Sequence, residues 1–165
     1  MTGRKPAIIS IKRRSFNIII RNVLLLNDTE DFEHWGCYGT SSALKEQLLN
    51  KGIMDIETIS VIEIRRSVYI PRNLAEFKDI NHFCNTYPDL VKKMMECDAV
   101  VINGEGTIHH ARKGARALLY FAYAAKHFFE KRVLLINHSC FPSVWRKKVM
   151  DFYKVGYSSC DFVAA

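Results

Sequence analysis

Residues 99–110 read AVVINGEGTIHH, in which four apolar residues run into Asn103, a Gly-Glu-Gly turn and two histidines. A short apolar run that breaks at glycines is typical of a buried strand that turns into a helix. Gly104 and Gly106 relieve the steric limits on the backbone at this turn and hold Glu105 at its rim. The stretch therefore predicts a central strand with a polar loop at its carboxyl end.

Segments typical of strands and of helices alternate on both sides of this stretch. Aliphatic or β-branched runs predict strands over residues 17–26, 56–64, 98–103, 132–137 and 161–165. Apolar residues at helical spacing predict helices over residues 39–52, 74–83, 90–96, 112–129 and 143–154. Alternation of this kind indicates right-handed crossovers and a mostly parallel sheet. The predicted fold class is α/β, a Rossmann-like doubly wound layer.

The length and charge of the chain limit the classes of protein to which it can belong. A chain of 165 residues predicts one compact domain, and 24 Lys and Arg against 17 Asp and Glu favour an anionic ligand or surface. No apolar run approaches the ~18 residues of a membrane span. The absence of an export signal favours the cytoplasm, while the positive charge allows contact with an anionic membrane surface. Basic residues do not interleave with aromatic residues as in RNA-binding motifs, so no nucleic acid is expected.

The chain divides into two predicted regions. Residues 1–16 carry five basic residues around a short apolar patch and form a basic N-terminal arm, either solvated or paired as an edge strand, with a targeting segment as the alternative. Residues 17–165 form the Rossmann-like domain. The sequence stops inside its last predicted strand, so we expect the front half of a longer protein, completed by a second domain or a partner chain.

Three polar loops follow predicted strands, and each begins with an asparagine. Ligands of open α/β sheets bind beyond the carboxyl ends of the strands, where these loops are expected to meet. The candidate substrate-binding residues lie in them: Asn27, Asp28, Trp35, Gly36, Gly39, Thr40, Ser41, Asn103, Gly104, Gly106, Thr107, His110, Asn137 and Ser139.

The first loop combines glycines with hydroxyl groups. Gly36 and Gly39 would let backbone approach a ligand, and Thr40 or Ser41 would stand at a helix N-terminus, where N–H groups and the helix dipole favour an anion. A capped helix after a glycine-rich turn is the alternative. Trp35 would either stack on a sugar ring or cover an edge of the core. The spacing fits neither a dinucleotide-binding fingerprint nor a P-loop.

The candidate catalytic residues are Glu105, His109 and His138. A carboxylate at the sheet rim accepts hydroxyl protons, and histidine titrates near neutral pH. Glu105 could instead cap the following helix. Adjacent histidines do not match metal-ligand spacing, so no zinc site is predicted, and His138 beside Ser139 does not form a nucleophile elbow. Neither a metal nor a cofactor is expected.

Three further basic residues, Arg112, Lys113 and Arg116, stand at the predicted start of a helix. Cations there oppose the helix dipole unless an anion lies nearby. A bound phosphate or carboxylate would remove the conflict, and solvated side chains on an exposed face are the alternative.

Four motifs carry a resemblance to a known family. They are NDTEDFEHWGCYGTSSAL at residues 27–44, DAVVINGEGTIHH at 98–110, KRVLLINHSCFPS at 131–143 and CDFVAA at 160–165. Their order and spacing resemble the N-terminal half of the polysaccharide pyruvyl transferase family over most of residues 17–165. Many relatives carry a plain glycine cluster where this chain has residues 103–106.

The resemblance implies a GT-B-like protein of two Rossmann-like domains with its active site in the cleft between them. The implied reaction moves a pyruvyl group from phosphoenolpyruvate to a sugar hydroxyl of a glycan or lipid-linked sugar. The loops named above would form the acceptor-facing wall, with Glu105 or a nearby histidine as base. The residues that bind phosphoenolpyruvate would lie mainly in the second half.

Two other functions remain open at this point. One is a glycosyltransferase of the same architecture with a nucleotide-sugar donor. The other is an inert module that binds an anion or a glycan and regulates a partner.

Overall fold

Five parallel strands form one sheet in this computed structural model, which describes residues 19–31, 34–66, 69–108, 112–138 and 147–164. The strands stand in the order β2-β1-β3-β4-β5. All four neighbouring pairs are parallel. The strand bounds are β1 Asn22–Asp28, β2 Asp55–Ser60, β3 Ala99–Asn103, β4 Arg132–Ile136 and β5 Phe162–Val163. The predicted α/β class and Rossmann-like doubly wound sheet are confirmed.

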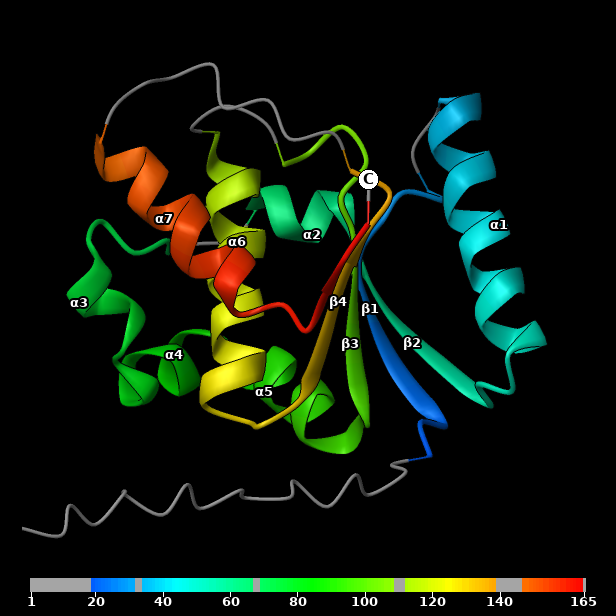
Figure 1. Ribbon diagram of the computed structural model, residues 1–165, viewed down its shortest axis with the longest axis horizontal. Helices are drawn as coiled ribbons and strands as arrows, with labels where there is room; N and C mark the ends of the chain where they lie inside the picture. The colour runs from blue at the N-terminus through cyan, green and yellow to red at the C-terminus, as the bar shows by residue number, and fades with distance from the viewer. Residues whose placement is uncertain (1–18, 32–33, 67–68, 109–111, 139–146, 165) are drawn as a thin grey trace, which may run out of the picture.

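Helices cover both faces of the sheet, but unequally. Among the described helices, α1 (Trp35–Asn50) lies by itself on one face, and the others lie on the opposite face (Figure 1). Those on the opposite face are α2 Val61–Arg66, α3 Leu74–Phe77, α4 Ile80–Thr86, α5 Pro88–Glu96, α6 Lys113–His127 and α7 Lys147–Ser158. This division follows from the right-handed crossovers between parallel strands. The connection from β1 to β2 moves towards one edge of the sheet, whereas the connections from β2 to β3, β3 to β4 and β4 to β5 move towards the other edge, so their helices lie on opposite faces.

The main core lies between the sheet and α6. Most side chains of this helix are buried, including Leu118 and Tyr120. Helix α7 crosses α6 closely at Gly156, where a Cβ atom would lie 2.5 Å from Leu119 Cδ2. A smaller cluster on the other face joins Val23, Leu25 and Val101 to α1. The burial of both faces explains why the central strands read as continuous apolar runs.

The strand predicted over residues 56–64 ends early. Strand β2 stops at Ser60, and residues from Val61 onward form α2. Ser60 and Glu63 make a capping box, in which Ser60 N–H donates to Glu63 Oε2 (2.8 Å) and Glu63 N–H donates to Ser60 Oγ (3.3 Å). Val61 and Ile64, one helical turn apart, are buried. The prediction was wrong here because β-branched residues concealed a helix start.

The helix predicted over residues 74–83 is two helices. Asn73 Oδ1 caps α3 by accepting from the N–H groups of Ala75 and Glu76. Asp79 accepts from His82 N–H and begins α4. Each cap satisfies backbone donors that a helix start leaves without a partner, so the chain restarts a helix at Asp79.

Two further boundaries differ from the prediction. Strand β1 begins at Asn22 and continues through Asp28, where a turn was expected from residue 27. Helix α1 begins at Trp35, four residues before the predicted start at Gly39. The predicted arm over residues 1–16 and the predicted helix start at residues 143–146 lie outside the described residues.

Candidate functional site

The three predicted loops meet at the carboxyl edge of the sheet. Strand β1 connects towards β2 on one side, whereas β3 connects towards β4 on the other, so the strand order reverses between β1 and β3. The chain leaves β1 for α1 and leaves β3 for α6, on opposite faces (Figure 1). Open α/β sheets bind ligands at such a reversal.

The three asparagines that open these loops bond to one another. Asn27 Nδ2 donates to the Asn103 carbonyl oxygen (2.7 Å), and Asn137 Nδ2 donates to Asn103 Oδ1 (3.1 Å). Thr107 Oγ1 donates to Asn27 Oδ1 (3.2 Å). Asn27 and Asn103 are fully buried. These amides and the Thr107 hydroxyl therefore tie three strand ends together, and their role in substrate binding stays a prediction.

The backbone explains why asparagine stands at two of these positions. Asn27 and Asn137 have φ angles of 64° and 52°. Asparagine tolerates this left-handed region better than most residues other than glycine. Asn27 also lies at a register shift between β1 and β2, a bulge that turns the chain out of the sheet.

Ser41 belongs to the same polar network. Its Oγ accepts from Thr29 N–H (2.9 Å) and from Asn103 Nδ2 (3.3 Å), and its side chain is buried. Thr40 Oγ1 donates to the Gly36 carbonyl within α1 (2.8 Å). The expectation that Thr40 or Ser41 marks the helix N-terminus was wrong, because both lie inside α1 with their oxygens engaged by the protein.

The start of α1 is exposed. Trp35, its first residue, is 91% exposed, so the indole does not cover the core edge. Gly36 and Gly39 are ordinary helical residues, and a Cβ atom added to Gly39 would meet nothing within 4 Å. The glycine-rich turn expected before this helix is not formed. His34 precedes the helix and its side chain makes no capping hydrogen bond.

Asp28 is held by an ion pair. Its Oδ2 lies 2.6 Å from Lys45 Nζ on α1, and Lys45 also contacts the Glu30 carboxylate. Burial opposes the charge of Lys45, but the hydrogen bonds to both carboxylates outweigh it and raise the pKa of the ammonium. Asp28 therefore anchors α1 to the end of β1.

Two positions of the β3–α6 loop require glycine for different structural reasons. Gly106 has a φ of 56°, as expected for a turn that favours glycine. Gly104 is needed for space, because a Cβ atom there would lie 2.2 Å from His138 Cβ. His138 is nearly buried, and its Nδ1 bonds to the Ala164 carbonyl oxygen (3.1 Å). A carbonyl oxygen only accepts, so Nδ1 is the donor in this hydrogen bond.

Glu105 lies in the turn directly after β3, ahead of α6, so it does not cap that helix. Its N–H donates to Asn103 Oδ1 (3.3 Å), and its Oε2 is buried without a hydrogen-bond partner in the described part of the chain. Burial and the charge of Glu105 raise the pKa of the Cys37 thiol, and the Arg65 guanidinium lowers it. The Cys37 thiol therefore lies within electrostatic reach of both the carboxylate and the guanidinium.

A basic pocket of about 320 Å³ opens beside this turn. Its lining joins α2, the β3–α6 loop and the start of α6: Arg65, Gly106, Thr107, Arg112, Lys113 and Gly114. Gly114 keeps the walls close, because a Cβ atom there would lie 3.2 Å from Thr107 Cγ2. Three cationic residues thus converge on one cavity at the N-terminus of a fifteen-residue helix.

The sequence identified part of this pocket. Arg112 and Lys113 were singled out as cations at a helix start, and both line it. Arg65 was missed because residues 56–64 were read as one strand, which placed it in an unassigned segment. The Ser60-to-Glu63 capping box was the signal that would have placed Arg65 on α2. Arg116 does not line the pocket, and its Nε is buried without a partner among the described residues.

Three predicted site residues, His109, His110 and Ser139, lie outside the described residues. Within the described ranges, no group of three or more His, Cys, Asp or Glu side chains is placed to hold a metal ion. No helix there has the length and apolar character needed to cross a membrane.

Comparisons of the chain with protein-family models, curated proteins and solved structures found no match. Function is therefore inferred from the site and from the motifs of the sequence.

Proposed function

We propose that the carboxyl edge of the sheet binds the substrates of a sugar-modifying transferase with a phosphate-bearing donor, the class to which the polysaccharide pyruvyl transferases belong. The observation that carries the proposal is the basic pocket, which is lined by Arg65, Arg112 and Lys113 and by Gly106, the residue that follows Glu105. The glycan or lipid-linked sugar acceptor and the donor phosphoenolpyruvate come from the resemblance.

The residues around the pocket suit such a transfer. Transfer from phosphoenolpyruvate to a sugar requires a base at the hydroxyl and positive charge around the departing phosphate. Glu105 is the base of this proposal, since one of its oxygens has no partner among the described residues. The three cations stabilise the phosphate, and the first N–H groups of α6 add partial positive charge.

Ligand titration tests the proposal. Calorimetry with phosphoenolpyruvate should show binding that weakens about tenfold or more in Lys113→Gln, because a hydrogen bond to a charged group contributes about 1.5–3 kcal/mol. Lys154→Gln is the matched control, since Lys154 is exposed on α7 and does not line the pocket. Equal binding by both variants would contradict the assignment of the pocket.

Saturation-transfer NMR distinguishes the donors. Phosphoenolpyruvate is expected to give a stronger signal than nucleotide sugars and to be displaced by inorganic phosphate. The reverse order would instead support a nucleotide-sugar glycosyltransferase.

A binding module without catalysis is the second candidate, and one observation favours it. The polar side chains at the strand ends form hydrogen bonds with one another and with neighbouring backbone groups. This holds for Asn27, Asn103, Asn137 and Ser41, so few of the described polar groups at this edge are left to take part in catalysis. Turnover of phosphoenolpyruvate by the wild-type chain separates the two candidates, because a binding module has none, and Glu105→Gln then tests the assigned base. Loss of turnover with retained phosphoenolpyruvate binding supports the transferase, and retained turnover removes Glu105 as the base.

A further inference from the structure

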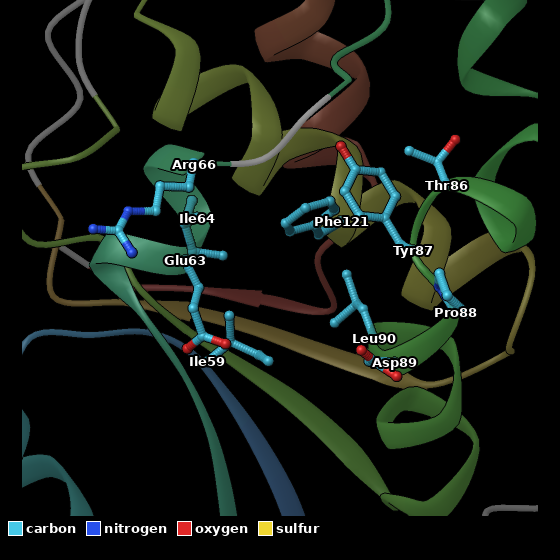
Figure 2. A pocket seen from close by; sticks show the side chains of 10 residues that line it. All are labelled: Ile59, Glu63, Ile64, Arg66, Thr86, Tyr87, Pro88, Asp89, Leu90 and Phe121. Atoms are coloured by element: carbon cyan, nitrogen blue, oxygen red, sulfur yellow. The ribbon is translucent and has the colours of Figure 1, made fainter.

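A second cavity, of about 310 Å³, lies between α2 and α5 above β2 (Figure 2). Ile64 and Phe121 form its floor and are almost completely buried. Ile59 of β2 and Leu90 of α5 add aliphatic walls, and Tyr87 faces Ile64 across the cavity. A cavity of this size and lining suits one bulky apolar group.

The cavity adjoins an unpaired strand edge. Strand β2 is the outermost strand of the sheet, and among the described residues it pairs with β1 alone. Its outer edge therefore presents backbone N–H and C=O groups. Glu57 and Ile59 lie on the α5 face, since Glu57 pairs with Lys93 of α5 (2.5 Å) and side chains alternate along a strand.

The geometry favours an extended polypeptide at this place. A strand added beside β2 would bond to its free edge, and its side chains on the α5 face would stand next to Ile59, at the cavity. Peptide-binding domains that accept an added strand obtain affinity from main-chain bonds and specificity from such pockets. A small apolar molecule would fill the cavity but leave the edge unpaired.

Charged side chains at the rim of the cavity favour a bound segment that carries positive charge. The exposed residues Glu63 and Asp89 line the cavity with a single cation, Arg66. Two carboxylates against one guanidinium make this rim locally acidic on a chain whose formal charge is +7. Lysine or arginine beside the apolar anchor of a bound segment would complement these carboxylates.

We propose that the free edge of β2 and the cavity beside it bind an extended segment of a partner protein. The segment adds as a strand to β2, inserts one bulky apolar side chain between α2 and α5, and carries a basic residue next to it. This surface is separate from the basic pocket, because Arg65 of α2 lines that pocket whereas Glu63, Ile64 and Arg66 line this cavity.

A labelled peptide tests the proposal on the full chain. The probe is the peptide K-V-T-F-T-V-K, whose phenylalanine serves as anchor, and fluorescence anisotropy measures its binding. We expect saturable binding that falls at least tenfold when alanine replaces the phenylalanine. Ile59→Trp, which fills the cavity, should weaken binding by a similar factor.

Asp89→Asn provides a variant at an exposed site that should fold normally. It should weaken the lysine-bearing peptide about threefold and leave a glutamine-bearing version unchanged, as expected for one screened charge pair. Equal binding by the anchor-less peptide, or binding unaffected by both protein variants, would overturn the proposal.

Hydrogen exchange locates the bound peptide. In parallel pairing, about half of the β2 amides point away from β1, and these should exchange rapidly in the unbound chain and slowly in the complex. Slow exchange of these amides in the unbound chain would show that the chain already covers its own edge. Unchanged exchange in the complex would show that the peptide binds elsewhere, and either result overturns the proposal.

Discussion

Substitution of Gly104 by alanine tests the close approach of the β3–α6 loop to the end of β4. The added Cβ atom would lie 2.2 Å from His138 Cβ and 3.2 Å from His138 Cα. Carbon atoms in contact are normally about 3.5–4.0 Å apart, so the two segments must separate by more than ~1 Å.

That separation weakens two bonds. Gly104 N–H donates to the Ile136 carbonyl (2.9 Å), and His138 Nδ1 bonds to the Ala164 carbonyl (3.1 Å). Overpacking costs about 1–3 kcal/mol, and each net hydrogen bond contributes about 0.5–1.5 kcal/mol. We therefore expect Gly104→Ala to lower the free energy of unfolding by about 2–6 kcal/mol.

Urea denaturation followed by circular dichroism measures this change, with two other glycines as controls. Gly106→Ala meets no atom within 4 Å but keeps a φ of 56°, so strain of about 1–2 kcal/mol is its only expected cost. Gly39→Ala lies inside α1 with open space around it and should stabilise the chain by about 0.5–1 kcal/mol. A Gly104→Ala variant as stable as Gly106→Ala would refute the packing argument.

Three further predictions concern charge and polar bonding. Two backbone N–H groups donate to Asp98 Oδ2 and lower the pKa of its carboxyl, so its contribution to stability exists above about pH 4 and is lost as pH falls through the lowered pKa; Asp98→Asn should therefore be less stable than wild type at pH 7, and the difference in free energy of unfolding should shrink as the pH falls below about 4, whereas a difference that does not change with pH would contradict this account. Glu105→Gln should speed alkylation of Cys37 at pH 8, measured by peptide mass spectrometry, and Arg65→Gln should slow it, because these charges shift the thiol pKa in opposite directions; an unchanged rate in either variant would show that the charge removed is too distant to act, and changes of the same sign would contradict the electrostatic account. Asn103→Ala removes three hydrogen bonds from a buried site and should cost about 2–4 kcal/mol in the same denaturation assay, whereas a loss below about 0.5 kcal/mol would exclude a structural role.

The alternation of strand-like and helix-like segments along the sequence was sufficient to predict the fold class, because each segment can be recognised from its own local composition. Residues 99–102 and 133–136 are apolar on both faces of a covered strand, and Gly106 marks the turn that follows the first of them. The meeting of the three loops was also predictable, since the carboxyl ends of parallel strands share one edge of the sheet.

The roles of individual polar residues were not predictable, because they depend on contacts between distant segments. Asn27 and Asn103 are 76 positions apart, and only the pairing of β1 with β3 brings the Asn27 side chain to the Asn103 carbonyl oxygen. Trp35 begins a helix without a capping side chain, so no local signal marked that boundary. Arg65 joined the basic pocket through a short helix hidden in a β-branched run.

The bond between Gly104 N–H and the Ile136 carbonyl also affects how the protein ages. An asparagine followed by glycine deamidates when the next backbone nitrogen attacks the side-chain carbonyl and forms a succinimide ring. In the fold that nitrogen is engaged by Ile136, and the Asn103 amide is buried and held by its own partners. Deamidation at this site therefore requires the edge of the sheet to open, so its rate in stored protein would record how often that opening occurs.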